Sequence, residues 1–132
     1  MAGYSGTPLP QKLGIKEGHA IALIGAPADF ELGPLPAGVQ VKRKLVGTLD
    51  VIVVFVKRRA DLEARIAASR PRMAPAAGLW IAWPKRASGV ITDMTEGAIR
   101  EVALPTGLVD NKVCAIDAVW SGLRLVIRRE LR

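Results

Sequence analysis

Two long apolar stretches dominate the pattern of hydrophobic and polar positions, and both are followed by basic residues. The first covers residues 50–56 and the second residues 79–83, and both are rich in β-branched or aromatic side chains. Uninterrupted apolar runs of this length predict strands that are covered on both faces, as in a parallel sheet. Between them, residues 59–69 carry Leu62 and Ile66 four positions apart, which predicts a helix with one apolar stripe. The pattern therefore predicts a strand–helix–strand unit with parallel strands.

Four further strands are expected around this unit. Residues 20–24 form an apolar run. Within residues 39–45, one side carries Val39, Val41 and Arg43 and the other Gln40, Lys42 and Lys44, which is typical of an edge strand. Residues 112–120 and 123–129 predict a C-terminal hairpin closed by the two-residue loop Ser121-Gly122. The chain thus predicts one α/β domain over residues 1–132, a short Rossmann-like and mostly parallel sheet that ends in an antiparallel hairpin.

Three further helical segments are predicted outside the central unit. Residues 11–13 and 28–32 are expected to form brief turns, and a longer helix is expected over residues 94–104. Asp93 and Glu96 have the spacing of a capping box at the start of this longer helix. Capping explains these two carboxylates more simply than a pair that performs acid–base catalysis.

Basic residues follow two strands that are expected to be neighbours. Lys57-Arg58-Arg59 follows residues 50–56, and Lys85-Arg86 follows residues 79–83. The carboxyl edge of an open α/β sheet is where such folds bind ligands, and Gly25 ends another strand at the same edge. The predicted ligand-binding residues are therefore Gly25, Lys57, Arg58, Lys85 and Arg86, with side chains from both basic clusters lining one concavity with the Gly25 turn. Gly25 also has a simpler interpretation as a tight turn, because the glycines that would complete a dinucleotide fingerprint are missing.

The charge of the chain changes the expected partners. Its formal net charge is +7, from 19 Lys and Arg against 12 Asp and Glu. A positive field attracts anions, so the partners to consider are an anionic small molecule, an acidic protein and nucleic acid. Aromatic residues make up only 5% of the chain, which leaves few stacking platforms for single-stranded nucleic acid. The basic clusters also have a simpler interpretation as solvated surface.

The remaining reactive residues exclude several kinds of site. The chain has one cysteine, Cys114, and one histidine, His19, so we expect no metal site, no internal disulfide and no histidine-based hydrolase. A lysine-based reaction at Lys57 or Lys85 stays open. No apolar run is long enough for a membrane span and no signal peptide is visible, so we expect a cytoplasmic protein of bacterial type.

The predicted hairpin has two sides of different character. Cys114 falls on its apolar side and is interpreted as a small buried hydrophobe. On the other side, Asp117 lies diagonal to Arg124 and Arg128, which predicts a structural ion pair across the strands. Residues 112–120 are expected at the edge of the sheet with few protective features, so a second copy of the chain could cover this strand in a homodimer.

Several segments resemble a family of small uncharacterised bacterial proteins, known as a domain of unknown function. They are YSGTPL from Tyr4, KLGIK at 12–16, GAP at 25–27, LWIAWPK at 79–85, SGVITDMTE at 88–96 and GLVDNKVCAIDAVWSGLRLV at 107–126. The resemblance covers nearly the whole chain. It implies no activity and transfers no catalytic residues.

The predicted order of elements also resembles the core of class I S-adenosylmethionine (SAM)-dependent methyltransferases, whose sheet likewise ends in an antiparallel hairpin. This resemblance implies a strand order of 2-1-3-4-6-5. Two departures speak against cofactor binding in the usual mode. The first strand lacks the acidic, glycine-rich turn that holds the amino-acid end of the cofactor, and the second strand ends in Lys44-Leu45-Val46 without a carboxylate for the ribose hydroxyls. We therefore expect no cofactor.

From the sequence, the leading hypothesis is a non-catalytic binding module whose basic pocket takes an anionic small ligand or an acidic partner. The first alternative is a nucleic-acid-binding protein that uses a basic face. The second is an enzyme whose chemistry the sequence does not reveal, since no catalytic motif is visible.

Overall fold

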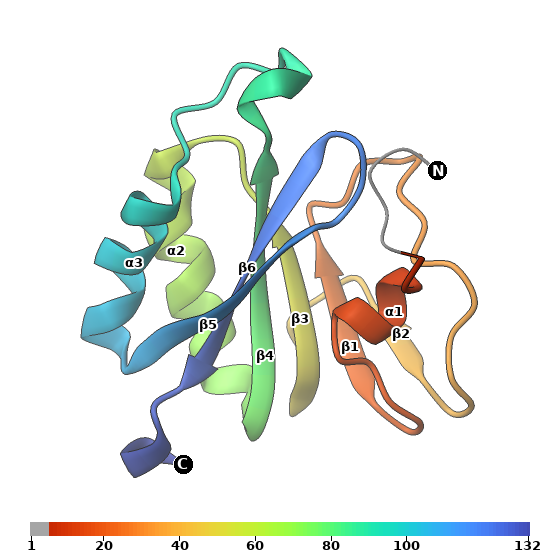
Figure 1. Ribbon diagram of the computed structural model, residues 1–132. Helices are drawn as coiled ribbons and strands as arrows, with labels where there is room; N and C mark the ends of the chain where they lie inside the picture. Colours follow the sequence, from red (N-terminus) through yellow and green to blue (C-terminus); the bar gives the residue numbers. More distant parts are fainter. Residues whose placement is uncertain (1–5) are drawn as a thin grey trace.

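The computed structural model describes residues 6–132, and within them six strands form one sheet (Figure 1). Tyr4 and Ser5, which begin the YSGTPL segment, lie outside the described residues. The strands are β1 (Ala20–Ile24), β2 (Gln40–Lys42), β3 (Leu49–Phe55), β4 (Met73–Pro84), β5 (Leu108–Ala115) and β6 (Trp120–Ile127). Their order in the sheet is β2-β1-β3-β4-β6-β5, which confirms the predicted order. The pairs β1–β2, β1–β3 and β3–β4 are parallel, and β6 pairs antiparallel with both β4 and β5. The predicted fold class is therefore confirmed.

The helices lie mainly on one side of this sheet (Figure 1). They are α1 (Leu9–Lys12), α2 (Arg59–Ser69) and α3 (Glu96–Ala103), with short 3-10 turns η1 (Arg70–Arg72), η2 (Arg86–Ser88), η3 (Leu104–Thr106) and η4 (Arg129–Leu131). We call the side covered by α2 and α3 the helix face. The opposite side, covered by α1 and by residues 25–39, is the loop face.

Each face buries its own apolar core. On the helix face, Leu62 and Ile66 of α2 and Ile99 of α3 pack against the sheet. Trp83 belongs to this core and Trp80 to the core of the loop face, because residues three apart in a strand point to opposite sides. The exposed fraction of the residue is 0% for Trp80 and 9% for Trp83. The prediction that both indoles are buried on opposite faces is confirmed.

The hairpin turns earlier in the sequence than predicted. Ser121 and Gly122 lie inside β6, and the turn consists of residues 116–119. Asp117 Oδ1 accepts hydrogen bonds from the backbone N–H groups of Val119 and Trp120, both at 2.8 Å. An aspartate that binds the backbone ahead of it stabilises a turn by itself. The predicted pairing of Asp117 with Arg124 and Arg128 is therefore wrong, although its role is structural.

Gly122 is needed in the strand for a packing reason rather than for a turn. A Cβ at this position would lie 2.8 Å from Ile116 Cδ1 and 3.0 Å from Trp80 Cε3. Glycine inside a strand often marks such a close approach. Close packing, and not a hairpin turn, therefore explains the glycine of the Ser121-Gly122 pair.

The start of α3 also differs from the predicted capping box. The N-cap is Thr95, whose side-chain oxygen accepts a hydrogen bond from Ala98 N at 3.0 Å. Asp93 instead accepts a hydrogen bond from the N–H of Arg59, the first residue of α2, at 2.7 Å. A carboxylate at this place satisfies one of the free N–H groups of the first turn and favours the positive end of the helix dipole. Asp93 thus serves the neighbouring helix.

The segment after β1 forms no helix at residues 28–32. It turns through a hydrogen bond from Phe30 N to Pro27 O at 3.0 Å and then runs without regular structure to β2. The Phe30 ring packs edge-on against Phe55, with ring centroids 4.9 Å apart. Burial of this ring holds the segment on the loop face, so tertiary packing overrides the weak local helical signal. No helix within residues 6–132 is long and apolar enough to cross a membrane.

Candidate functional site

The carboxyl ends of β1, β3 and β4 emerge at the same edge of the sheet, at the top of Figure 1. Three other segments reach this edge: residues 25–35 after β1, residues 85–95 between β4 and α3, and the turn between β5 and β6. The turn lies there because β6 runs antiparallel to β4, with Trp120 opposite Pro84. This edge is where parallel α/β sheets place their ligand sites.

One part of the edge is basic and lies over β3 and β4. A concavity of about 440 Å³ is lined by Lys57 and Arg58, and a second one of about 680 Å³ is lined by Arg86 and by Trp83. Residues 91–93 line both concavities. We call Lys57, Arg58 and Arg86, together with this shared loop, the basic rim.

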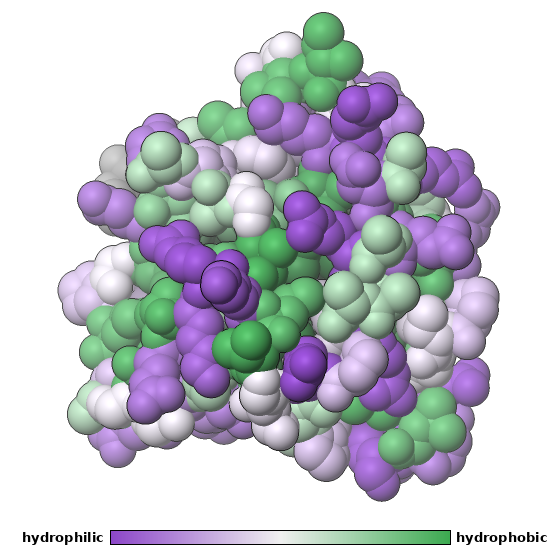
Figure 2. All heavy atoms as spheres, turned by 180° about the vertical axis from the view of Figure 1, so that it is seen from behind, coloured by the Kyte–Doolittle hydropathy of each residue, from purple (hydrophilic) through white to green (hydrophobic). Residues whose placement is uncertain are grey.

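Hydrogen bonds fix the shared loop in place. Thr92 Oγ1 donates to Lys57 O at 2.6 Å and accepts from Met94 N at 3.1 Å. The bond from Arg59 N to Asp93 attaches the same loop to α2. Ile91 at its tip is 93% exposed, and Figure 2 shows apolar side chains projecting at this end of the molecule. The rim therefore combines cationic side chains with an exposed apolar one.

The other two residues of the predicted set, Gly25 and Lys85, make backbone contacts beside the basic rim. Gly25 has φ +71°, and a Cβ there would lie 3.1 Å from Phe55 O, so the chain's own backbone occupies the space that its missing side chain leaves. Lys85 donates its backbone N–H to Val119 O at 2.7 Å, which attaches the hairpin turn to the end of β4. Neither residue lines the two basic concavities. The structure thus brings Lys57, Arg58 and Arg86 to one loop, and places Gly25 and Lys85 beside it.

The other part of the edge is acidic and aromatic and lies beside β1. A cavity of about 320 Å³ between the turn after β1 and the hairpin turn is lined by Pro27, Asp29, Phe30, Glu31, Asp117, Val119 and Trp120. We call it the carboxylate cavity. Phe55 lies between its two aromatic rings, 4.9 Å from Phe30 and 5.0 Å from Trp120 between ring centroids. Three carboxylates in one cavity are notable in a chain with an excess of basic residues.

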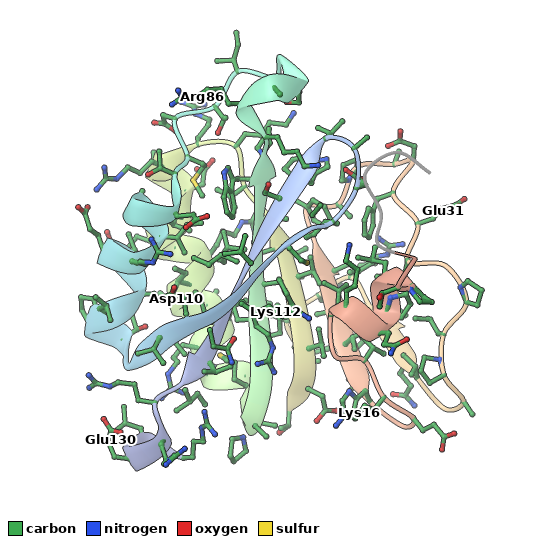
Figure 3. All side chains as sticks on the ribbon, in the orientation of Figure 1. Lys16, Glu31, Arg86, Asp110, Lys112 and Glu130 are labelled. Carbon is green, nitrogen blue, oxygen red and sulfur yellow. The ribbon has the colours of Figure 1, made fainter. Side chains whose placement is uncertain are left out.

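A second concavity adjoins the carboxylate cavity on the side of β2. It measures about 440 Å³ and is lined by Leu23, Phe30, Glu31, Leu32, Gly33, Leu35, Val41 and Arg43. Phe30 and Glu31 line both spaces. Figure 3 places Glu31 on the loop after β1 and Arg86 on the other side of this edge. Asp93 and Glu96 line the same concavity as Arg86, so the basic side also carries carboxylates.

Sequence reasoning missed Asp29 and Glu31. The available signal was their position, a few residues after the strand that ends at Gly25. In the predicted helix over residues 28–32, their side chains would point in unrelated directions. Only the packing of Phe30 onto Phe55 shows that they line a cavity together with the hairpin turn.

The other reactive residues form no site among the described residues. No group of three or more His, Cys, Asp or Glu side chains within residues 6–132 could hold a metal ion. His19 lies before β1, at the opposite end of the strand, where its Nδ1 accepts a hydrogen bond from Lys16 N at 3.1 Å. Burial raises the pKa of the Cys114 thiol, and the nearby charges of Lys12 and Lys112 oppose this to a smaller extent. Such a cysteine is a poor nucleophile at neutral pH.

Solved structures with the same architecture include methyltransferases. The chain is similar to magnesium protoporphyrin IX methyltransferase from Synechocystis with bound S-adenosylhomocysteine (SAH), with a TM-score of 0.62, 12% identity, and coverage of 84% of this chain and 74% of that one. A SAM-dependent methyltransferase from Aquifex aeolicus matches with a TM-score of 0.59, 15% identity and coverage of 89% and 87%. The fibrillarin pre-rRNA processing protein of Methanococcus jannaschii matches with a TM-score of 0.62, 14% identity and coverage of 95% and 70%.

These comparisons establish the fold: the chain has the Rossmann-like architecture of SAM-dependent methyltransferases, as the weaker of the two sequence resemblances implied. No family model matches the sequence, and no curated protein matches it significantly, so membership of the uncharacterised bacterial family stays a prediction.

The leading functional hypothesis from the sequence needs correction. We expected a non-catalytic binding module, but the structural neighbours include methyltransferases, and some neighbours have SAM or SAH bound. The fold is therefore one that is used for catalysis, and basic clusters alone were an insufficient guide to function.

Proposed function

We propose that this chain is a SAM-dependent methyltransferase that acts on an anionic substrate. The observation that carries the proposal is a difference in charge between two parts of one sheet edge. Three carboxylates and no basic residue line the carboxylate cavity, whereas Lys57, Arg58 and Arg86 outnumber Asp93 and Glu96 around the basic rim. The carboxylate cavity lies beside β1, and the basic rim lies over β3 and β4. SAM carries a positive sulfonium, a positive amino group and one carboxylate, so its net charge is positive. A cationic cofactor and an anionic substrate would each meet the opposite charge.

The carboxylate cavity fits the cationic end of SAM. Asp29, Glu31 and Asp117 offer carboxylate oxygens that can accept hydrogen bonds from an ammonium group. Phe30 and Trp120 offer aromatic rings, whose faces attract a cation such as a sulfonium. Asp117 already uses Oδ1 for the turn, which leaves its other oxygen for a ligand.

The ribose end of SAM needs a different contact from the one that the methyltransferase resemblance implies. The strand β2 ends at Lys42 and is followed by Arg43 and Lys44, so no carboxylate stands there. Glu31 lines both the carboxylate cavity and the adjoining apolar concavity, and its carboxylate can accept from ribose hydroxyls. The residues therefore fit the cofactor through the loop after β1 rather than through the end of β2. This replaces our prediction of no cofactor.

When bound, SAM supplies an activated methyl group to a nucleophile on the substrate. The chain's own part would be to attract and orient that substrate. Lys57, Arg58 and Arg86 offer positive charge for an anionic group, and Ile91 offers an apolar contact beside it. Holding the substrate near the cofactor is the main contribution that such residues make.

Isothermal titration calorimetry with SAM and SAH tests the cofactor assignment. We expect both to bind, SAM more tightly because only SAM carries the sulfonium charge. Glu31→Gln and Asp29→Asn should each weaken SAM binding by about tenfold, since each removes a charged hydrogen-bond acceptor. Glu17→Gln is the matched control, because Glu17 is an exposed carboxylate that lines none of these cavities. Absence of binding at millimolar SAM, or equal weakening by the control, would contradict the proposal.

A homodimer through β5 stays a prediction and is part of this proposal. The strand β5 lies at the edge of the sheet, and its Val113 is 50% exposed. An edge strand offers unpaired N–H and C=O groups to a second copy. Light scattering at micromolar concentration should give twice the monomer mass of 14.1 kDa. A constant monomer mass over that range would rule the dimer out.

A further inference from the structure

We propose that Arg124, on the loop face, forms a second anion-binding site that takes a phosphate group. This site is separate from the carboxyl edge and does not rest on the proposed methyl transfer. Three observations support it: the space in which the guanidinium lies, its lack of a partner, and the charges beside it.

The guanidinium of Arg124 lies in a space that glycine leaves open. Arg124 pairs with Trp80 across the β4–β6 ladder, and its side chain runs over Gly78. A Cβ at Gly78 would lie 2.5 Å from Arg124 Nε and 3.0 Å from Cζ and Nη2. Any side chain at position 78 would therefore push the guanidinium out. The glycine at position 78 thus lets the Arg124 guanidinium lie in a defined place against the sheet.

This guanidinium has no protein partner. Within residues 6–132 it makes no hydrogen bond and no ion pair, whereas Arg59 pairs with Glu101 and Arg100 pairs with Glu96 and Asp110. Burial lowers the pKa of Arg124, and the charge of Arg132 lowers it further. A half-buried cation without a counter-charge is unfavourable, and a bound anion would relieve it.

The neighbouring residues add positive charge. Lys112 is the cross-strand partner of Arg124, so the two side chains lie on the same side of the sheet. Its Nζ donates to Lys12 O at the end of α1, at 3.1 Å, and retains two further N–H donors. Figure 3 shows Lys112 over the middle of the sheet. The nearest carboxylate along β5, Asp110, is bound to Arg100 at 3.0 Å and does not neutralise this group.

A phosphate suits these charges better than a single carboxylate. It carries up to two negative charges and several acceptor oxygens, and the flat guanidinium can donate two parallel hydrogen bonds to it. Arg124 would make this paired contact, and Lys112 would add a third donor from the next strand. The ligand is thus expected to be inorganic phosphate or a phosphate ester.

Nuclear magnetic resonance of the arginine Nε–Hε groups, titrated with inorganic phosphate at constant ionic strength, tests this site. The Arg124 signal should shift along a saturable curve, while the signal of exposed Arg65 on α2 should not saturate. Acetate, titrated in the same way, should bind more weakly than phosphate.

Gly78→Ala is the decisive variant because it displaces the guanidinium without changing the net charge. The displaced atoms belong to the end of a flexible side chain, so the fold should survive. Phosphate affinity should fall by about tenfold or more in Gly78→Ala and in Arg124→Gln, and stay unchanged in Arg65→Gln. Equal phosphate affinity in the wild type and Gly78→Ala would overturn the proposal, because phosphate binding would then depend only on general charge attraction. A linear response of Arg124, or equal binding of acetate, would overturn it as well.

Discussion

The helix face and the loop face of the sheet both bury an apolar layer, but they are held in place by different means. On the helix face, the helices α2 and α3 cover the sheet. Thr95 caps its own helix locally, and Asp93 caps α2 from the loop before α3. On the loop face, single long-range hydrogen bonds attach the covering segment to the sheet. Trp80 Nε1 donates to Leu13 O at 3.1 Å, and Lys112 Nζ donates to Lys12 O.

The difference shows where this fold can carry a site. A helix forms its own backbone hydrogen bonds and leaves little conformational freedom to the chain at the carboxyl edge. The loop after β1 instead presents carboxylates and an aromatic ring there. Loops on a rigid scaffold are where binding residues usually lie. The carboxylate cavity accordingly lies between two irregular segments of the loop face.

The largest effect should come from the helix face. Trp83→Ala removes a nearly buried indole from its core, and we expect a loss of about 3–5 kcal/mol in the free energy of unfolding, because the cavity left behind adds to the lost burial. Urea unfolding followed by circular dichroism measures it. A loss below about 1 kcal/mol would mean that the helix cover is not tightly packed.

A smaller effect is expected from the polar anchor of the loop face. Trp80→Phe removes the indole N–H and leaves the carbonyl of Leu13 without its donor, at a cost of about 1–3 kcal/mol. Trp120→Phe is the matched control, since the same indole is removed from the same core but its N–H makes no hydrogen bond within the described residues. Hydrogen exchange should speed up over residues 9–15 in the first variant more than in the second. The same exchange rates in both would show that the bond does not hold α1.

The cap of α3 should matter less. Thr95→Ala leaves the N–H of Ala98 without its acceptor and should cost about 1 kcal/mol of unfolding free energy. Thr48→Ala, at an exposed position with no such bond, should change stability by less than about 0.5 kcal/mol. Chemical denaturation measures the unfolding free energy of both variants. Equal losses would show that the Thr95 cap does not stabilise the fold.

The smallest effect concerns Cys114, on the loop face. Burial raises its pKa, so the reactive thiolate forms only at a higher pH than in free cysteine. Its alkylation by iodoacetamide should therefore be slow at pH 8, and the pH at which the rate is half-maximal should exceed that of free cysteine. A half-maximal rate at or below the free-cysteine value would show that this part of the loop face is open to water.

The sequence predicted the regular half of the molecule well, because continuous or periodic apolar patterns determine it. The helix α2 and the strand β1 begin and end where the pattern predicted, and the strand order is confirmed. The strand β4 begins earlier than predicted, since its first residues, among them Pro75, lack the continuous apolar pattern.

The candidate site could not be predicted in the same way. Asp29 and Glu31 meet Asp117 only because Phe30 packs on Phe55 and the hairpin turns at residues 116–119. Both facts depend on contacts between residues far apart in the sequence, which no local pattern encodes. The basic rim was visible because its residues directly follow predicted strands, although Gly25 and Lys85 line neither of its concavities.

Mapping SAM onto the chain by backbone amide shifts tests the central claim most directly. A titration of the wild-type protein to about 1 mM SAM should shift residues 27–35 and 117–120 along saturable curves and leave α2 and α3 unchanged. These two segments line the carboxylate cavity and its neighbour. Unchanged spectra at that concentration, or shifts confined to residues outside these segments, would contradict the assignment of a SAM-dependent methyltransferase.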